Sequence, residues 1–257
     1  MPLVEIRNLA KRFGGLTAVF DLDLDIEPGV IQGLIGPNGA GKTTTLNMLG
    51  GSLFPTKGEI TFKGKDITRL SPYQRAQRGI ARVFQHDVLF SSFTVLENIL
   101  VAFHLQSGTN VGEILFGGAS TLRRKKAMRH KALELLHFVG LDSLADEPAI
   151  NLPHGNQRLL GLAIALATQP QLLLLDEPVT GMNAEEVASM LSVIRTVRDE
   201  KGITAVLVEH NVKAVMSICD RICVLSFGRK LSEGLPKEIA ENPAVIEAYL
   251  GAEQDVA

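Results

Sequence analysis

The spacing of hydrophobic and polar residues changes along the chain, and each change indicates a different kind of structure. Residues 20–26, FDLDLDI, alternate with a period of two. Such alternation predicts a half-buried antiparallel strand with one apolar face and one solvated face. We expect the apolar face to hold Phe20, Leu22, Leu24 and Ile26, and the solvated face to hold Asp21, Asp23 and Asp25. The three aspartates would also suit a metal cluster, but their period-2 spacing favours the solvated face.

Short β-prone runs around this segment predict further strands. Residues 3–7 (LVEIR) form one such run, and residues 30–35 (VIQGLI) form a more apolar run that suits a buried strand. Residues 58–67 (GEITFKGKDI) predict an edge hairpin whose turn is Lys63-Gly64-Lys65.

A helical period replaces these patterns beyond residue 85. Residues 91–105 and 121–140 predict two amphipathic helices, separated by a glycine-rich loop or insertion near 107–120. After residue 160, apolar strands at 171–175, 203–208 and 221–225 alternate with helices near 184–201 and 211–219. We therefore predict an α/β core with its β subdomain in residues 1–87 and 160–231. A helical region would occupy residues 88–159, and a helical tail would occupy 232–257.

Composition excludes several classes of protein. The 257-residue chain is 46% hydrophobic, which supports a substantial core, and its net charge of −2 argues against a dedicated nucleic-acid binder. The N-terminus lacks the apolar run of a signal peptide, and the most apolar stretch, 159–175, is too short and interrupted to span a bilayer. Cys219 and Cys223 suit half a metal site by spacing, but buried core thiols are the favoured interpretation. We expect a reducing, cytoplasmic location.

A glycine-rich stretch between a predicted strand and a predicted helix carries the clearest chemical signal. Residues 36–43, GPNGAGKT, match the phosphate-binding loop, in which bare backbone N–H groups and the positive end of a helix surround phosphates. Lys42 would reach the β- and γ-phosphates, and Thr43 would offer a hydroxyl to Mg²⁺. A plain strand-to-helix turn would not require the Gly-Lys-Thr ending. We expect ATP to contact Gly36, Pro37, Asn38, Gly39, Ala40, Gly41, Lys42, Thr43 and Thr44.

Two acidic residues follow the apolar run at 172–175 in the sequence LLLLDEP. A strand there would present Asp176 and Glu177 at its carboxyl end. Asp176 would then hold the Mg²⁺ shell, and Glu177 would orient or deprotonate the attacking water. Either acid alone is ordinary at the end of a strand, but the pair beside a phosphate loop indicates a nucleotide-hydrolysing site.

The order of these motifs resembles the nucleotide-binding subunit of an ABC transporter over essentially the whole chain. The resemblance implies a single ABC ATPase domain, residues 1–257, with a P-loop NTPase core, an N-terminal antiparallel β subdomain and an inserted α-helical subdomain. It implies ATP and Mg²⁺ as cofactors. The implied catalytic residues are Glu177, His210 and Gln85, and the implied metal-holding residues are Thr43, Gln85 and Asp176.

The same resemblance assigns roles to residues outside the phosphate loop. Phe13 would stack on adenine, with Val19 nearby. Gln85 would link Mg²⁺ and the attacking water to the helical subdomain, and His210 would contact the γ-phosphate. Asn183 stands where the family usually has the aspartate that communicates across a dimer.

The signature peptide departs from the family pattern. The family sequence Leu-Ser-Gly-Gly-Gln, which reaches the γ-phosphate held by the opposite subunit, is replaced by Leu152, Pro153, His154, Gly155 and Asn156. Pro153 supplies neither a hydroxyl nor an amide hydrogen. Gly155 and the N-terminus of the following helix are expected to remain available. His154 would either add a donor or fill space.

Five details resemble the ATP-binding subunit of branched-chain amino acid importers: RFGGLTAV at 12–19, the run FQH...LF...TV.EN at 84–98, the insertion near 107–120, EPVTGMN at 177–183 and the tail NPAVIEAYLGA at 242–252. Related urea and amide importers share much of this pattern. The implied partners are a second ABC ATPase subunit (identical or different), transmembrane permease subunits and, indirectly, a periplasmic solute-binding protein. No nucleic acid is implied, and the protein would sit peripherally on the inner face of the cell membrane.

Two other classes of function remain as alternatives. A non-transport ABC ATPase normally carries two cassettes or long coiled-coil insertions, and the sequence shows neither. An interaction module with a dead nucleotide site is disfavoured by Lys42, Asp176, Glu177 and His210.

Overall fold

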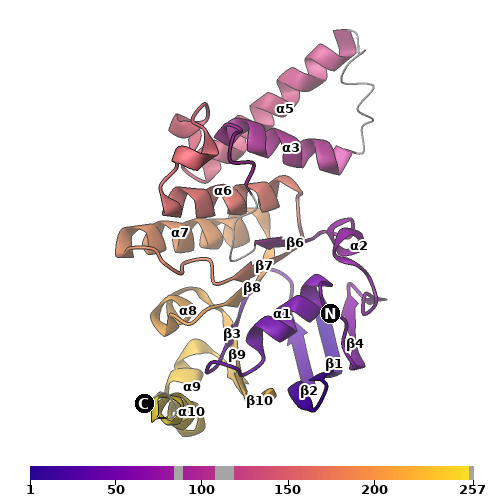
Figure 1. Cartoon of the computed structure of the whole chain (residues 1–257), viewed down its shortest axis with the longest axis vertical. Coiled ribbons are helices and arrows are strands. Elements are labelled where there is room, and N and C mark those ends of the chain that lie inside the picture. Colours follow the sequence, from indigo (N-terminus) through magenta and orange to yellow (C-terminus); the bar gives the residue numbers. More distant parts are fainter. Residues whose placement is uncertain (84–88, 108–118, 255–257) are drawn as a thin grey trace. The chain divides into compact units, whose positions relative to one another are not determined.

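The structure is a computed structural model that describes residues 1–83, 89–107 and 119–254 (Figure 1). The described chain divides into two compact units. Unit 1 consists of Met1–Arg82, Gln171–Glu177 and Ile194–Ala257, and unit 2 consists of Val83–Pro170 and Pro178–Val193. Gln85 and most of the glycine-rich stretch near 107–120 lie outside the described residues.

One sheet of unit 1 is antiparallel, with strand order β2-β1-β4-β5. Its members are β1 (Val4–Phe13), β2 (Leu16–Ile26), β4 (Lys57–Phe62) and β5 (Lys65–Asp66). Lys63 and Gly64 both have left-handed φ values and form the turn between β4 and β5, as the sequence predicted. Asp21, Asp23 and Asp25 are exposed, which confirms the solvated-face interpretation.

The apolar face predicted for residues 20–26 is wrong at Phe20, whose side chain is 43% exposed. The cause is an irregularity in the ladder: Leu9 pairs with Leu22 but Lys11 pairs with Val19, so β2 carries one extra residue. Asp21 takes up the irregularity with a φ of 51°, and Val19 occupies the buried face instead of Phe20. The ring of Phe20 lies against the Arg229 guanidinium, whose central carbon is 3.7 Å from the ring centroid.

Among the described residues, six strands form the second sheet, in the order β10-β9-β3-β8-β7-β6. They are β10 (Arg229–Gly234), β9 (Arg221–Ser226), β3 (Ile31–Ile35), β8 (Thr204–Val208), β7 (Leu172–Asp176) and β6 (Ile80–Val83). Strands β9, β3, β8 and β7 run parallel, and β10 returns antiparallel to β9. Strands β3, β7 and β8 are buried along their whole length, which explains their nearly continuous apolar sequences.

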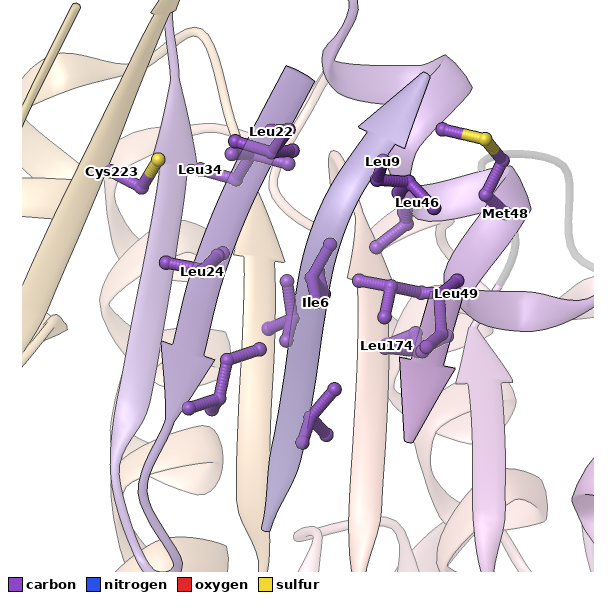
Figure 2. Close-up of a cluster of buried hydrophobic side chains, with 14 of the residues drawn as sticks. Ile6, Leu9, Leu22, Leu24, Leu34, Leu46, Met48, Leu49, Leu174 and Cys223 are labelled. Carbon is purple, nitrogen blue, oxygen red and sulfur yellow. The ribbon is translucent and has the colours of Figure 1, made fainter. Parts of the chain in front are cut away.

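The two sheets and helix α1 (Lys42–Gly50) share one hydrophobic core. Figure 2 shows Leu46 and Leu49 of α1 between Leu9 of the antiparallel sheet and Leu174 of the parallel sheet. Because α1 begins directly after the glycine-rich loop, this packing fixes the direction in which its N-terminus points. The other helices of unit 1 are α2 (Pro72–Ala76), α8 (Val212–Ile218), α9 (Pro236–Ala240), α10 (Pro243–Gln254) and the later part of α7 (Ala184–Lys201).

Unit 2 is built mainly from helices α3 (Val95–Ser107), α5 (Ala119–Phe138) and α6 (His154–Ala167), which contact one another pairwise. Two short 3-10 turns, η1 (Asp142–Leu144) and η2 (Ala149–Asn151), lead from α5 to α6. The Thr94 hydroxyl accepts from the Glu97 N–H at 3.1 Å, and the Glu97 carboxylate accepts from the Thr94 N–H at 2.8 Å. This reciprocal cap explains where α3 begins. The α/β core, the antiparallel sheet and the helical region predicted from the sequence are thus all confirmed.

Both cysteines lie in the core of unit 1, as predicted. Cys219 and Cys223 are buried, and burial raises the pKa of each thiol to about 12. A Cβ atom placed on Gly33 of β3 would lie 3.0 Å from the Cys219 Sγ, so the thiol is packed against bare backbone. Among the described residues, no helix has both the length and the apolar character that a membrane span requires.

A buried arginine, Arg75 of α2, joins α1 to the segment that follows the antiparallel sheet. Its side chain is almost completely buried, and burial lowers its pKa to about 10, so the guanidinium remains charged at neutral pH. The guanidinium donates to five backbone carbonyls, those of Met48, Leu49, Ile67, Thr68 and Leu70. It thereby adds donors to two of the last carbonyls of α1, of which that of Met48 also accepts from the N–H of the C-cap residue Gly51 at 3.3 Å.

Replacing Arg75 with Met should destabilise the protein by about 2–4 kcal/mol, because several buried carbonyls lose their donor. Urea unfolding followed by circular dichroism measures the loss. The matched control is Arg78→Met, since Arg78 is an exposed arginine beside the same helix and should change stability by no more than about 0.5 kcal/mol. Equal midpoints for the two variants would contradict the structural role of Arg75.

Candidate ATPase site

The glycine-rich loop is held between backbone atoms of two strands. Gly36 has a φ of 149°, and a Cβ atom there would lie 2.1 Å from the Leu225 carbonyl oxygen of β9. Gly41 has a φ of 98°, and its Cβ would lie 2.5 Å from the Ala18 carbonyl oxygen of β2. Glycine is required at both positions by conformation and by space. Gly41 is also the N-cap of α1 and offers no side-chain cap, which leaves the first N–H groups of the helix for an anion.

Lys42, the first residue of α1, folds back over this loop. Its Nζ donates to the carbonyls of Gly36 at 2.7 Å and Pro37 at 2.8 Å, and the side chain is buried. Burial lowers the pKa of Lys42, and the nearby Glu177 carboxylate opposes that shift. The Lys42 ammonium therefore favours the binding of a negatively charged group at this loop. Thr43 is exposed and Thr44 is partly exposed, and Asn38 and Gly39 at the tip of the loop are also exposed.

The register of the parallel strands brings the acidic residues beside this loop. Val208 of β8 is level with Leu34 of β3 on one side and with Asp176 of β7 on the other. The segments that follow these strands therefore emerge at the same edge of the sheet, where ligands of open α/β sheets bind. They are the loop beginning at Gly36, the acid Glu177 and the pair Glu209-His210.

Asp176 and Glu177 are adjacent in sequence but have different partners. Asp176 is buried, and its Oδ2 accepts from Nη2 of Arg82 at 2.7 Å. Glu177 has a left-handed φ of 50°, and its N–H donates to the Val208 carbonyl at 2.9 Å. Its Oε1 lies 2.7 Å from Nε2 of His210. The structure thus brings Lys42, Asp176, Glu177 and His210 to one site, as their predicted roles require.

The residues expected near adenine differ in exposure. Phe13, at the end of β1, is 48% exposed, and the Lys11 ammonium lies 5.1 Å from the centroid of its ring. The exposed face of Phe13 therefore suits a stacking partner. Val19 is fully buried and packs beneath Gly41, so its side chain supports the loop from below and has no surface to present to a base.

Asn183 of unit 2 is the N-cap of α7. Its Oδ1 accepts from the N–H groups of Glu185 at 2.9 Å and Glu186 at 3.0 Å, while Oε2 of Glu186 accepts from the Asn183 N–H at 3.0 Å. This is a reciprocal cap, and an asparagine fills the N-cap as well as an aspartate would. The departure from the family residue at Asn183 is thus compatible with the local geometry.

The signature peptide, also in unit 2, leads into α6 with Pro153 at the N-cap. Leu152 is buried, Pro153 and His154 are exposed, and Asn156 is partly exposed. The expectation that Gly155 remains available is wrong. Gly155 is buried, and a Cβ atom there would lie 2.6 Å from Oε1 of Glu186, so this carboxylate covers the glycine.

Sequence reasoning missed three residues that hold the predicted ones in place: Arg82, Glu186 and Arg75. The N-x-x-E spacing of Asn183 and Glu186 is a capping pattern that reveals the role of Glu186 from sequence. Neither arginine lies in a pattern of this kind, because each acts on a residue far away in the chain. In fold and arrangement, the described site defines a P-loop ATPase cassette.

Comparison with known proteins gives the family. The sequence profile of the ABC transporter family matches residues 19–180, and the profile of the branched-chain amino acid ATP-binding cassette transporter matches residues 229–255. The chain is 42% identical over 250 residues to the high-affinity branched-chain amino acid transport ATP-binding protein LivG of Escherichia coli strain K12, covering 97% of this chain and 98% of that protein. It is 40% identical to the corresponding protein BraF of Pseudomonas aeruginosa, with the same coverage of each chain.

Solved structures agree with this assignment. The ADP conformation of an ATP-binding cassette of an ABC transporter superposes with a TM-score of 0.84 at 30% identity, covering 98% of this chain and 99% of that one. A dimeric, post-hydrolysis cassette bound to ADP and phosphate superposes with a TM-score of 0.76 at 25% identity, covering 91% of this chain and 98% of that one. The chain belongs to the ABC transporter family and, within it, to the branched-chain amino acid transport ATP-binding proteins. It is an ABC ATPase, which binds ATP and hydrolyses it to drive transport.

Substitution of Lys42 by Ala should weaken ATP binding by about 10–150-fold, because a charge-assisted contact of about 1.5–3 kcal/mol is removed. Isothermal titration calorimetry measures the change. Lys63→Ala is the control, since Lys63 is a lysine in the β4–β5 turn and should leave the affinity unchanged. An unchanged affinity in the Lys42 variant would contradict the assignment of the loop.

Proposed function

We propose that this chain powers the import of branched-chain amino acids through an ABC permease. The observation that carries the proposal is the C-terminal match: residues 229–255, which contain β10, α9 and α10, fit the branched-chain amino acid profile. The core motifs alone belong to every ABC ATPase, so they do not discriminate between cargoes. The whole-length similarity to LivG and BraF supports the same substrate class. In this role the chain is cytoplasmic and peripheral on the inner face of the membrane, where it docks on permease subunits.

The residues of the site divide the chemistry between them. The phosphate loop and Lys42 hold the triphosphate, and the exposed face of Phe13 stacks on the base. Glu177 accepts the proton of the attacking water, and Nε2 of His210, 2.7 Å from its carboxylate, holds that carboxylate in place and reaches toward the γ-phosphate. Gln85, three residues after Arg82, is proposed to link this site to the helical unit.

The oxygen donors present suit Mg²⁺. Thr43 offers a hydroxyl, Asp176 offers a carboxylate, and hard oxygen ligands of this kind, together with phosphates, are what Mg²⁺ prefers. When bound, the ion neutralises charge that develops on the phosphates. Asp176 is buried, and one oxygen of its carboxylate is held by Arg82.

Two such subunits work as a dimer in this proposal, and a different ATP-binding subunit is the partner that the signature peptide favours. A homodimer would carry Pro153 in both composite sites. A partner with a serine at this position would complete the site built on Lys42 and Glu177 of this chain. The partner's own site, facing LPHGN at 152–156, would then be the weaker one.

Reconstitution with the permease subunits and solute-binding protein of the same transporter tests the substrate class. Leucine-loaded binding protein should stimulate ATP hydrolysis and leucine uptake into proteoliposomes, and urea or short amides should not. Glu177→Gln is the control, because its amide cannot accept the proton of water and both activities should disappear. Stimulation by urea or an amide would assign the other importer class. Stimulation by nucleic acid, with no response to any solute, would favour a non-transport ATPase.

The heterodimer hypothesis is tested by Pro153→Ser. If the missing donor limits the site, the serine variant should hydrolyse ATP about 10²–10³-fold faster than wild type as a homodimer. Pro153→Ala separates the causes, since it restores the backbone N–H but not the hydroxyl. Melting temperatures must accompany the rates, because serine is also the better N-cap for α6. A homodimer whose rate does not rise in the serine variant would show that the proline is not limiting.

A further inference from the structure

The Arg82 side chain contacts both Asp176 and helix α1. It lies on β6, directly before the segment that contains Gln85, and its side chain is only 11% exposed. Its Nη2 donates to Oδ2 of Asp176 at 2.7 Å. Its Nη1 donates to Oδ1 of Asn47 at 2.7 Å and reaches the Ser52 hydroxyl at 3.3 Å. One guanidinium therefore spans from the end of β7 to α1 and the turn after it.

The contacts of Arg82 with α1 do not depend on Asp176. Asn47 belongs to the same helix as Lys42, and the chain passes Arg82 closely at Gly50, where a Cβ atom would lie 3.5 Å from Nη1. An arginine anchored in this way stays in place when the other partner of Asp176 changes. Its planar fork can hold Asp176 with one arm while the other arm remains on Asn47, which a single ammonium group cannot do.

We propose that Arg82 is a positioning residue for the metal: it fixes the Asp176 carboxylate in the orientation in which it serves the Mg²⁺ of bound ATP. This proposal rests on the proposed role of Asp176 in metal binding. Asp176 is 5% exposed, so its carboxylate is oriented by its protein partners rather than by water. Outer partners of metal ligands typically contribute 10- to 100-fold to metal affinity, because they orient the ligand before the metal arrives.

The arrangement also couples two parts of the site. Because Arg82 bonds to Asn47, the carboxylate of Asp176 is placed relative to α1, the helix whose first turn holds Lys42 and Thr43. Thr43 and Asp176, the two residues expected to share the metal, are thus both positioned relative to α1. A substitution at Asn47 should therefore also weaken Mg²⁺ binding, although it leaves the ion pair between Arg82 and Asp176 in place.

The experiment measures metal binding directly and needs no turnover. A fluorescent ATP analogue is bound to the protein in EDTA, and the free Mg²⁺ concentration that half-saturates the change in fluorescence is then determined. For Arg82→Gln we expect this concentration to rise about 10–100-fold, with the affinity for the analogue in EDTA unchanged. Arg82→Lys should fall between the wild type and the glutamine variant, because it keeps the charge and loses the fork. Asn47→Ala should shift the concentration in the same direction by a smaller factor.

Arg78→Gln is the matched control, since it makes the same change at an exposed arginine close in sequence, and it should leave the Mg²⁺ requirement unchanged. An Mg²⁺ requirement in Arg82→Gln equal to or lower than that of the wild type would overturn the proposal. If Arg82→Gln does not fold, Asn47→Ala decides in its place, and an unchanged requirement there overturns it equally. A wild-type protein that binds the analogue but shows no response to Mg²⁺ would instead overturn the assignment of Asp176 to the metal, and this proposal with it.

Discussion

The structure depends on the close approach of the phosphate loop to the backbone of two strands. Gly36 lies against the Leu225 carbonyl of β9 and Gly41 lies against the Ala18 carbonyl of β2, at separations that leave no room for a Cβ atom. Other features serve this contact. The hairpin between β9 and β10 reaches the loop through the Gly228 N–H, which donates to the Ala40 carbonyl, while the Gly228 carbonyl accepts from Phe20. Both sheets thus shape the loop, which is the preorganisation that phosphate binding favours.

Each charge of the site already has an internal partner. The Lys42 ammonium lies on two loop carbonyls, Asp176 pairs with Arg82, and Glu177 lies beside His210. When a ligand binds, these side chains therefore exchange an internal partner for the ligand. The three pairs differ in how they take part in that exchange. Lys42 bonds to carbonyls of its own loop, whereas Arg82 also bonds to Asn47 of α1.

The sequence predicted the fold well, because its elements are encoded locally, and it selected Lys42, Asp176, Glu177 and His210, which the structure brings to one site. Period-2 and helical patterns identified the main elements, and the Gly-Lys-Thr and Asp-Glu motifs identified the site. Prediction was wrong where the cause is a relation between distant segments. Phe20 left the core because β2 gained one residue relative to β1. Gly155 is covered because Glu186, some thirty residues later, turns its free carboxylate oxygen toward it. The roles of Arg75 and Arg82 could not be predicted for the same reason, since their partners lie in α1 and β7. The short strand β10 was also missed, since RKLSEG lacks an apolar pattern.

The packing of the two cysteines has a practical consequence for spectroscopy. Cys219 and Cys223 are the only cysteines of the chain, both are buried, and with thiol pKa values of about 12 both remain protonated at neutral pH. Thiol-directed reagents require an accessible thiolate, so they should not react with the two natural cysteines of the folded protein. A single cysteine introduced on an exposed surface, for example on the helical unit, would carry a spin label or fluorophore without prior removal of the natural ones. The wild-type core would stay intact, and a change in the surroundings of the label on ATP binding would be measurable in an otherwise unaltered chain.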